Sequence, residues 1–97
     1  MIIVSGDIVA KPECRSAALA ASLKHVQHSE GEEGCISHAV YQDVTNPLRL
    51  FFFEQWQDQQ ALDKHFKHAN SLAFIASLDG LLSAAPNLHI YAAQQLR

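Results

Sequence analysis

The sequence has little cysteine, glycine or proline and no concentrated basic segment. Its 97 residues include two cysteines, four glycines and three prolines, which excludes a disulfide-rich scaffold and a low-complexity chain. Seven Lys and Arg residues against ten Asp and Glu residues give a net charge of -3. Nucleic-acid binding needs a concentrated basic surface, and here the basic residues are scattered. We therefore expect no nucleic-acid partner.

Long apolar runs and secretion signals are also missing. No run approaches the roughly 20 residues of a membrane span, and the opening MIIVSGDIVAKPE lacks the parts of a signal peptide. We expect a cytoplasmic protein without membrane contacts, in which Cys14 and Cys35 are free thiols. Phosphate-binding loops, dinucleotide fingerprints and the G-x-S-x-G motif are absent. With 48% hydrophobic residues, residues 1–97 are expected to fold as a single domain.

Hydrophobic periodicity predicts the order strand, helix, strand, strand, helix, strand. Alternating and β-branched residues predict strands at 2–10, 35–44, 48–56 and 88–95. Helical spacing and capping residues predict helices at 12–28 and 58–68, with a short one from about 70 to 78. This order is the split βαβ pattern of the ferredoxin-like α+β fold, with a four-stranded antiparallel sheet and its helices on one face. The bare, largely apolar face predicts a homodimer whose sheets face each other, a dimeric α+β barrel.

The helix at 12–28 carries a narrow apolar stripe and two histidines. Leu19, Leu23 and Val26 fall at helical spacing and are expected to pack on the sheet. His25 and His28 are expected near a solvated end of this helix.

The strand at 48–56 and the helix that follows carry the residues of chemical interest. One face of the strand combines a carboxylate and an indole with apolar residues, namely Leu50, Phe52, Glu54 and Trp56. The inward stripe of the helix holds Leu62, His65, Phe66 and Ala69. Glu54, Trp56 and His65 are therefore expected to face the same interior space.

These three residues also have an ordinary structural interpretation, in which His65 and Trp56 fill the core and Glu54 pairs with a lysine. The carboxylate favours the functional interpretation, because burying Glu54 without a partner is costly. His65, across the layer, is the natural partner. Such a pair holds the imidazole in one tautomer and keeps it basic near neutral pH.

Other candidate residues give weaker indications. His38 shares a strand face with Ile36 and Val40, and is either a core histidine or, as we slightly favour, a pocket wall. His65 and His68 have ligand spacing on one helix, but no Cys or acidic residue beside them completes a metal set. We expect no metal site. Cys35 is interpreted as a small hydrophobic residue rather than a nucleophile.

Three short motifs, taken in this order, resemble the antibiotic biosynthesis monooxygenase family, including the small bacterial quinol monooxygenases. They are Glu33-Gly34-Cys35, Glu54-x-Trp56 and Ala61-Leu62-x-x-His65. The resemblance covers nearly the whole chain and implies a dimeric ferredoxin-like fold. It also implies oxygenation of a quinol or another dihydroxylated aromatic with O2, without metal, flavin or haem. Many members carry a second histidine five positions after the first, where this chain has Asn70.

The leading hypothesis is thus a cofactor-independent monooxygenase. In it His65 removes a phenolic proton, Glu54 orients His65, and Trp56 and Phe52 hold the aromatic ring. His38 would hydrogen-bond the second oxygen of the substrate. Further contacts to the substrate are expected from Phe66 and Asn70.

Three alternatives accompany this hypothesis. Haem-degrading relatives would carry tryptophan where His65 stands and a haem-ligating histidine near Ile75, so haem is set aside. A related branch isomerises a phosphorylated sugar, which would require a basic cluster that Lys11, Arg49, Lys64 and Lys67 do not obviously provide. A non-catalytic dimeric binding or stress-response protein is the alternative from another functional class.

Overall fold

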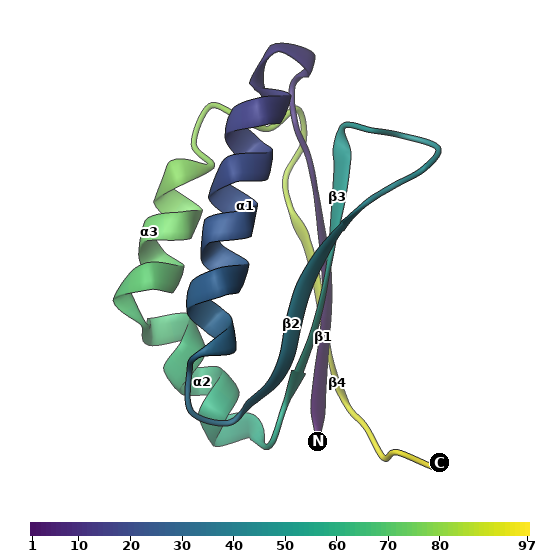
Figure 1. Cartoon of the computed structure of the whole chain (residues 1–97), viewed down its shortest axis with the longest axis vertical. Coiled ribbons are helices and arrows are strands. Elements are labelled where there is room, and N and C mark those ends of the chain that lie inside the picture. The colour runs from purple at the N-terminus through teal and green to yellow at the C-terminus, as the bar shows by residue number, and fades with distance from the viewer.

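A four-stranded antiparallel sheet carries three α-helices on one face in the computed structural model, which describes residues 1–97 (Figure 1). The elements are β1 (Ile2–Val9), a 3₁₀ turn η1 (Pro12–Cys14), α1 (Arg15–Glu30), β2 (Cys35–Gln42), β3 (Arg49–Trp56), α2 (Gln59–Lys67), α3 (Ala69–Ser77) and β4 (Asn87–Ala92). The strand order is β2-β3-β1-β4, with antiparallel neighbours throughout. This confirms the predicted ferredoxin-like α+β fold.

The central strand β3 directs alternate side chains to the two faces of the sheet. Its inner face is buried from Leu50 to Trp56, while Phe51, Phe53 and Gln55 on the outer face are partly exposed. Glu54 pairs in register with Val4 of β1 and His38 of β2. The strand pairing therefore places a carboxylate and an imidazole side by side under the helices.

A β-bulge changes the face that the sequence predicts for β2. The register shifts between Cys35 and Ser37, and the intervening Ile36 is 52% exposed. Cys35 packs beside the core that contains Trp56, and His38 is buried. The sequence predicted that Ile36 shares a strand face with His38 and Val40. This prediction is wrong for Ile36, because one extra residue in the strand interrupts the alternation of side chains.

Small and polar residues, rather than leucines, form the buried face of α1. Its buried members are Ala18, Ser22, His25, Val26 and Ser29. Leu23, which was expected to pack on the sheet, is 46% exposed, and His25, which was expected near a solvated helix end, is 7% exposed. Both predictions are wrong. The hydroxyls of Ser22 and Ser29 donate to the carbonyls of Ala18 and His25 at 2.7 and 2.8 Å. Because these side chains are short and internally satisfied, the helix can lie close to the sheet.

A break at His68 separates α2 from α3. Asp58 caps α2 by accepting a hydrogen bond from the Ala61 N–H at 2.8 Å. His68 is extended, and its Nδ1 accepts from the Asn70 N–H at 3.1 Å. The predicted inward stripe holds for Leu62 and His65, whereas Phe66 and Ala69 are exposed. Ala69 leaves the stripe because the helix breaks at His68.

Two apolar clusters form the core, and the polar residues of β2 and β3 lie between them. The first contains Ile8, Val26, Leu50, Phe52 and Leu78, and the second contains Val4, Trp56, Ala61 and Leu62. Since Phe52 belongs to the first cluster and Trp56 to the second, Glu54 lies at their junction. The fold thus surrounds one carboxylate with apolar walls.

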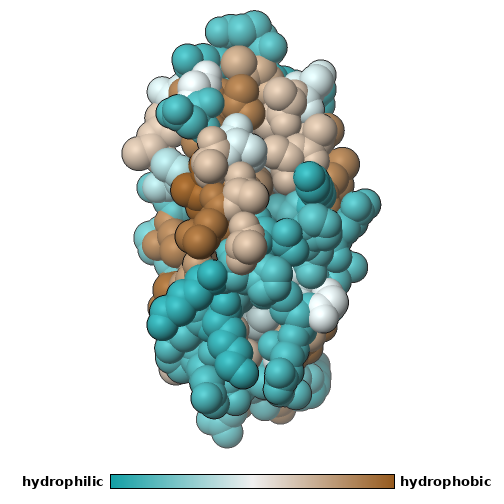
Figure 2. Space-filling model, turned by 90° about the vertical axis from the view of Figure 1, so that its left-hand side faces the viewer, coloured by the Kyte–Doolittle hydropathy of each residue, from teal (hydrophilic) through white to brown (hydrophobic).

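The two outer surfaces of the molecule differ in character. No helix covers the outer face of the sheet (Figure 1). Over the helices, Figure 2 shows a hydrophilic lower part, where Figure 1 places α2, and apolar residues above it. These exposed apolar residues include Leu23 of α1 and Leu72 and Ile75 of α3. None of the helices combines the length and the apolar character needed to cross a membrane.

Candidate active site

Glu54 is the centre of the buried polar cluster. Its Oε1 accepts a hydrogen bond from Trp56 Nε1 at 3.0 Å, and its Oε2 lies 3.3 Å from His38 Nε2. Burial alone would raise the pKa of Glu54, but the polar hydrogens of His38 and Trp56 and the charge of His65 outweigh it and lower that pKa. Glu54 is therefore an ionised carboxylate in an apolar surrounding.

His65 has a closer acidic partner than the sequence predicted. Its Nδ1 lies 3.0 Å from Glu32 Oε1 and 3.3 Å from Ser71 Oγ, whereas its Nε2 is 3.8 Å from Glu54 Oε1. The indole of Trp56 lies against the imidazole, with ring centroids 4.6 Å apart. Glu32 thus fixes one ring nitrogen of His65, and Glu54 lies on the side of the other.

Glu32 comes from the polar turn after α1, where sequence reasoning saw only a helix break. Gly34 in this turn has a φ of +82°, and a Cβ there would lie 2.4 Å from Ala61 Cβ of α2. The turn can therefore approach α2 closely only with glycine at this position. In the sequence, the two glycines that bracket Glu32 and Glu33 were the signal that this turn approaches α2 closely.

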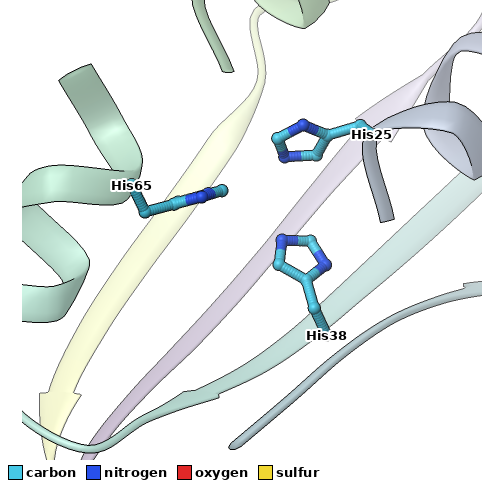
Figure 3. Close-up of side chains that lie close together, drawn as sticks. All are labelled: His25, His38 and His65. Carbon is cyan, nitrogen blue, oxygen red and sulfur yellow. The ribbon is translucent and has the colours of Figure 1, made fainter. Parts of the chain in front are cut away.

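His25 is the second functional candidate that the sequence reasoning missed. Its ring stacks on Phe74 at a centroid distance of 4.2 Å and lies 5.1 and 5.3 Å from the rings of His38 and His65. Burial, followed by the charges of His38 and His65, lowers the pKa of His25 to about 4. Figure 3 shows these three histidines facing one another from α1, β2 and α2. They are also the group that can hold a metal ion.

A cavity of about 190 Å³ lies beside this cluster. Gly6 forms part of its wall, where a Cβ would lie only 3.0 Å from Asn87 O. The lining combines aromatic and aliphatic side chains with two imidazoles and two carboxylates, and it contains no lysine or arginine. The full lining is Gly6, Asp7, Ile8, His25, Phe52, Glu54, His65, Phe66, Ser71, Phe74, Ile75, Leu78, Pro86, Asn87 and Leu88. This composition suits a small, mostly apolar ligand with a few polar groups.

The structure brings together most of the residues singled out from the sequence. Phe52, Glu54, His65 and Phe66 line the cavity. His38 and Trp56 are buried behind these residues and do not line it, so their expected contacts with the substrate are absent from this geometry. Phe74 and His25 occupy the cavity wall instead.

Two further predicted positions lie apart from the cavity. Asn70 does not line it, and instead borders two other pockets, which His28 also lines. Cys35 is partly buried, and burial raises the pKa of its thiol to about 11, which agrees with a non-nucleophilic role.

Comparison with known sequences identifies one matching family. The profile of the antibiotic biosynthesis monooxygenase family matches residues 1–77. An uncharacterised protein from Synechocystis, sll1783, is 34% identical over 90 residues. The match covers 93% of this chain and 61% of that protein, so the chain spans about three fifths of this relative's length.

Solved structures share the fold over nearly the whole chain. A conserved protein from Methanosarcina mazei is 28% identical with a TM-score of 0.90, over 96% of this chain and 92% of that one. The protein Rv0793 from Mycobacterium tuberculosis is 24% identical with a TM-score of 0.91, over 97% and 95%. A proposed antibiotic biosynthesis monooxygenase from Deinococcus radiodurans is 22% identical with a TM-score of 0.94, over 100% and 96%. The last two resemblances concern the fold alone.

Proposed function

Because this chain belongs to the antibiotic biosynthesis monooxygenase family, we propose that it oxidises a small dihydroxylated aromatic, such as a quinol, with O2. The observation that carries the proposal is the setting of His65 at the cavity wall. The carboxylate of Glu32 binds its Nδ1 at 3.0 Å, which leaves Nε2 as the nitrogen available to a substrate. An oriented imidazole in an apolar cavity is suited to remove a phenolic proton.

The proposed reaction needs no external reductant. His65 Nε2 takes the proton of a phenolic hydroxyl, and the phenolate gives one electron to O2. The resulting superoxide joins the aromatic radical at a ring carbon that carries hydrogen, and the peroxide takes the proton back from His65 to become a hydroperoxide. Loss of water then leaves a quinone carbonyl on that carbon. One oxygen atom of O2 enters the product and the other leaves as water, while the substrate itself supplies the two electrons and two hydrogens that form this water.

The other residues of the cavity would bind and position the aromatic ring. Phe52, Phe66 and Phe74 offer apolar and stacking contacts. His25 would hydrogen-bond the second oxygen, a role assigned to His38 from the sequence. An apolar cavity of about 150 Å³ accommodates benzene, so about 190 Å³ favours one substituted ring. The absence of lysine and arginine from the lining disfavours a phosphorylated substrate.

Glu54 would support the proton transfer from a distance. Its Oε1 lies 3.8 Å from His65 Nε2, close enough to stabilise the imidazolium that forms when the phenol is deprotonated. The hydrogen bond from Trp56 fixes this carboxylate. Glu54 and Trp56 are positioning residues in this proposal, and His65 is the base.

We further propose that the chain acts as a homodimer through the outer face of its sheet. That face has no helical cover (Figure 1) and includes the partly exposed Phe51 and Phe53 and the exposed Tyr41 and Tyr91. Covering an apolar face of this kind with a second copy is the usual solution for a two-layer fold.

Oxygen uptake with a panel of quinols and monohydric phenols tests the proposed activity. Uptake that saturates with quinol, together with one atom of ¹⁸O from ¹⁸O₂ in the product and one in water, is the expected result. Reactions without protein measure autoxidation. Uptake no faster than autoxidation across the panel, or hydrogen peroxide as the reduced product, would contradict the proposal.

A further inference from the structure

Three histidines that are distant in the sequence converge beside the cavity. His25, His38 and His65 come from α1, β2 and α2, and Figure 3 shows their rings around a common space. Their potential ligand atoms all lie within 4.8 Å of one another. The three residues are 7%, 1% and 2% exposed. The fold therefore assembles a compact imidazole cluster away from bulk water.

Two nitrogens of this cluster have no hydrogen-bond partner within the protein. They are Nδ1 of His25 and Nδ1 of His38. Leaving a buried polar atom unpaired costs about 1–3 kcal/mol, so such atoms call for an explanation, and a bound ion is one. The carboxylate of Glu54 stands beside them, 3.3 Å from His38 Nε2 and 3.8 Å from His65 Nε2. The carboxylate thus lies beside two of the three histidines.

His65 also has the surroundings typical of a metal-binding histidine. Such a residue usually donates its other ring N–H to a carboxylate or carbonyl, which fixes the ring and raises its basicity. Glu32 occupies that position against Nδ1 at 3.0 Å. The remaining nitrogen, Nε2, is turned to the side of Glu54.

We propose that His25, His38 and His65, with Glu54 as a fourth ligand, bind one divalent transition-metal ion. Imidazole nitrogen suits zinc, cobalt, nickel, copper and iron, whereas magnesium and calcium prefer oxygen ligands. Metal–nitrogen bonds of about 2.0–2.1 Å place tetrahedral ligand atoms about 3.3 Å apart, so separations of up to 4.8 Å must shorten by as much as about 1.5 Å.

The sequence did not reveal this ligand set, because its members come from three separate elements. Ligand spacing was sought within one helix, where His65 and His68 fall at i and i+3. His68 is exposed, and its Nδ1 accepts a hydrogen bond from the Asn70 N–H at 3.1 Å. It caps α3 and takes no part in the cluster.

An ion at this site would inhibit the proposed oxidation, and this consequence alone rests on the proposed function. A metal bound to His65 Nε2 occupies the lone pair that would otherwise accept the phenolic proton. Quinol-dependent oxygen uptake should therefore fall in proportion to metal occupancy and recover when a chelator removes the ion.

Titration of chelator-treated protein with Co²⁺ tests the binding site directly. Visible absorption bands that saturate at one equivalent, and that Zn²⁺ removes while Mg²⁺ does not, are the expected result. Absence of saturable Co²⁺ binding at micromolar protein would overturn the proposal. The measurement needs no substrate, so binding without oxidation refutes only the proposed function, and oxidation without binding refutes only the metal site.

Two variants on α1 test whether the ion binds at this cluster. His25→Phe retains an aromatic ring to stack on Phe74 and removes one ligand, so Co²⁺ affinity should fall at least about 10- to 100-fold. His28→Phe, at an exposed position of the same helix, should bind like the parent protein. Circular dichroism checks folding, and Glu54→Gln, which keeps the shape of the side chain, serves if His25→Phe does not fold. Unchanged affinity in the folded ligand variant would show that the ion is held elsewhere and would overturn the assignment.

Discussion

Glu32 and His65 are 33 positions apart in the sequence, and Oε1 of the first lies 3.0 Å from Nδ1 of the second. The contact joins the turn after α1 to the buried face of α2. Because His65 is held by this carboxylate, by Ser71 and by the Trp56 ring, its imidazole has little freedom to rotate. The proposed base is therefore oriented before any substrate binds.

His65→Gln should remove most of the turnover while the fold survives. Glutamine is polar and long enough to retain a hydrogen bond toward Glu32, but it cannot accept the phenolic proton. General-base assistance is worth about 10² to 10⁴ in rate, so quinol-dependent oxygen uptake should fall by that factor. His28→Gln, at an exposed position of α1, is the control and should retain full activity. Unchanged turnover in folded His65→Gln would remove this residue from the mechanism.

Glu32→Gln should change how the rate depends on pH. The substitution keeps the shape of the side chain and removes the negative charge beside His65 Nδ1, which favours the protonated imidazole. The rise of the rate with pH should therefore move to lower pH, and the maximal rate should fall as the base weakens. Glu33→Gln changes the exposed neighbour in the same turn and should leave the profile unmoved. Identical profiles for both variants would show that Glu32 does not act through His65.

Gly34→Ala should destabilise the protein far more than Gly31→Ala, although both lie in the same turn. Gly34 has a φ of +82°, and an added Cβ would come within 2.4 Å of Ala61 Cβ. At Gly31, φ is −86°, and the nearest atom to an added Cβ lies 3.7 Å away. Backbone strain and overpacking together should cost at least about 2 kcal/mol at Gly34, against about 0.5 kcal/mol or less at Gly31. Urea denaturation of the two variants measures the difference, and equal midpoints would contradict it.

The element order was predictable because each strand and helix carries a strong local signal. The alternation of β3 and the Asp58 cap appear in the structure as expected from the sequence. Glu54 and Trp56 share the inward face of β3 because side chains alternate along a strand with a period of two. His65 lies on the inward face of α2 because side chains recur along a helix with a period of 3.6. The three residues therefore come together between the sheet and the helix. Local pattern therefore sufficed for the fold class and for the centre of the site.

What the sequence could not show are contacts set by the packing of distant segments. His25 was expected near a solvated end of its helix, and only the approach of the small residues of α1 to the sheet buries it. The Glu32–His65 pair depends on a close turn at Gly34 that no periodicity encodes. The bulge at Ile36 likewise follows from the pairing with β3 and not from residue type.

Phe53→Arg should convert the proposed dimer into a folded monomer. Phe53 lies on the outer face of the central strand, between Ser5 of β1 and Ala39 of β2 in register. A charge there would be buried without a partner if two sheets face each other. Leu72→Arg is the control, because Leu72 is exposed on the helical side. Sedimentation at micromolar concentration should show a dimer for the parent and for Leu72→Arg only. A monomeric parent protein would disprove the dimer.

Acidification should destabilise the metal-free protein through His25. Its pKa is about 4 in the folded protein against an ordinary value of 6.5, because burial disfavours the imidazolium. Between these two values the unfolded chain binds a proton that the folded chain does not, so the free energy of unfolding falls as pH decreases. The loss begins near pH 6.5 and is complete near pH 4. It should amount to about 3 kcal/mol in full, of which about 2 kcal/mol falls between pH 7 and pH 5.

Urea denaturation of the chelator-treated protein at pH 7 and pH 5 measures this effect. His25→Phe keeps a ring against Phe74 and removes the titrating group, so its stability should depend less on pH than that of the parent. His28→Phe should retain the parent's dependence, because His28 is exposed and lies outside the buried cluster. If His25→Phe loses as much stability between the two pH values as the parent does, the acid sensitivity originates in another group. In that case His25 is not the buried neutral imidazole described here.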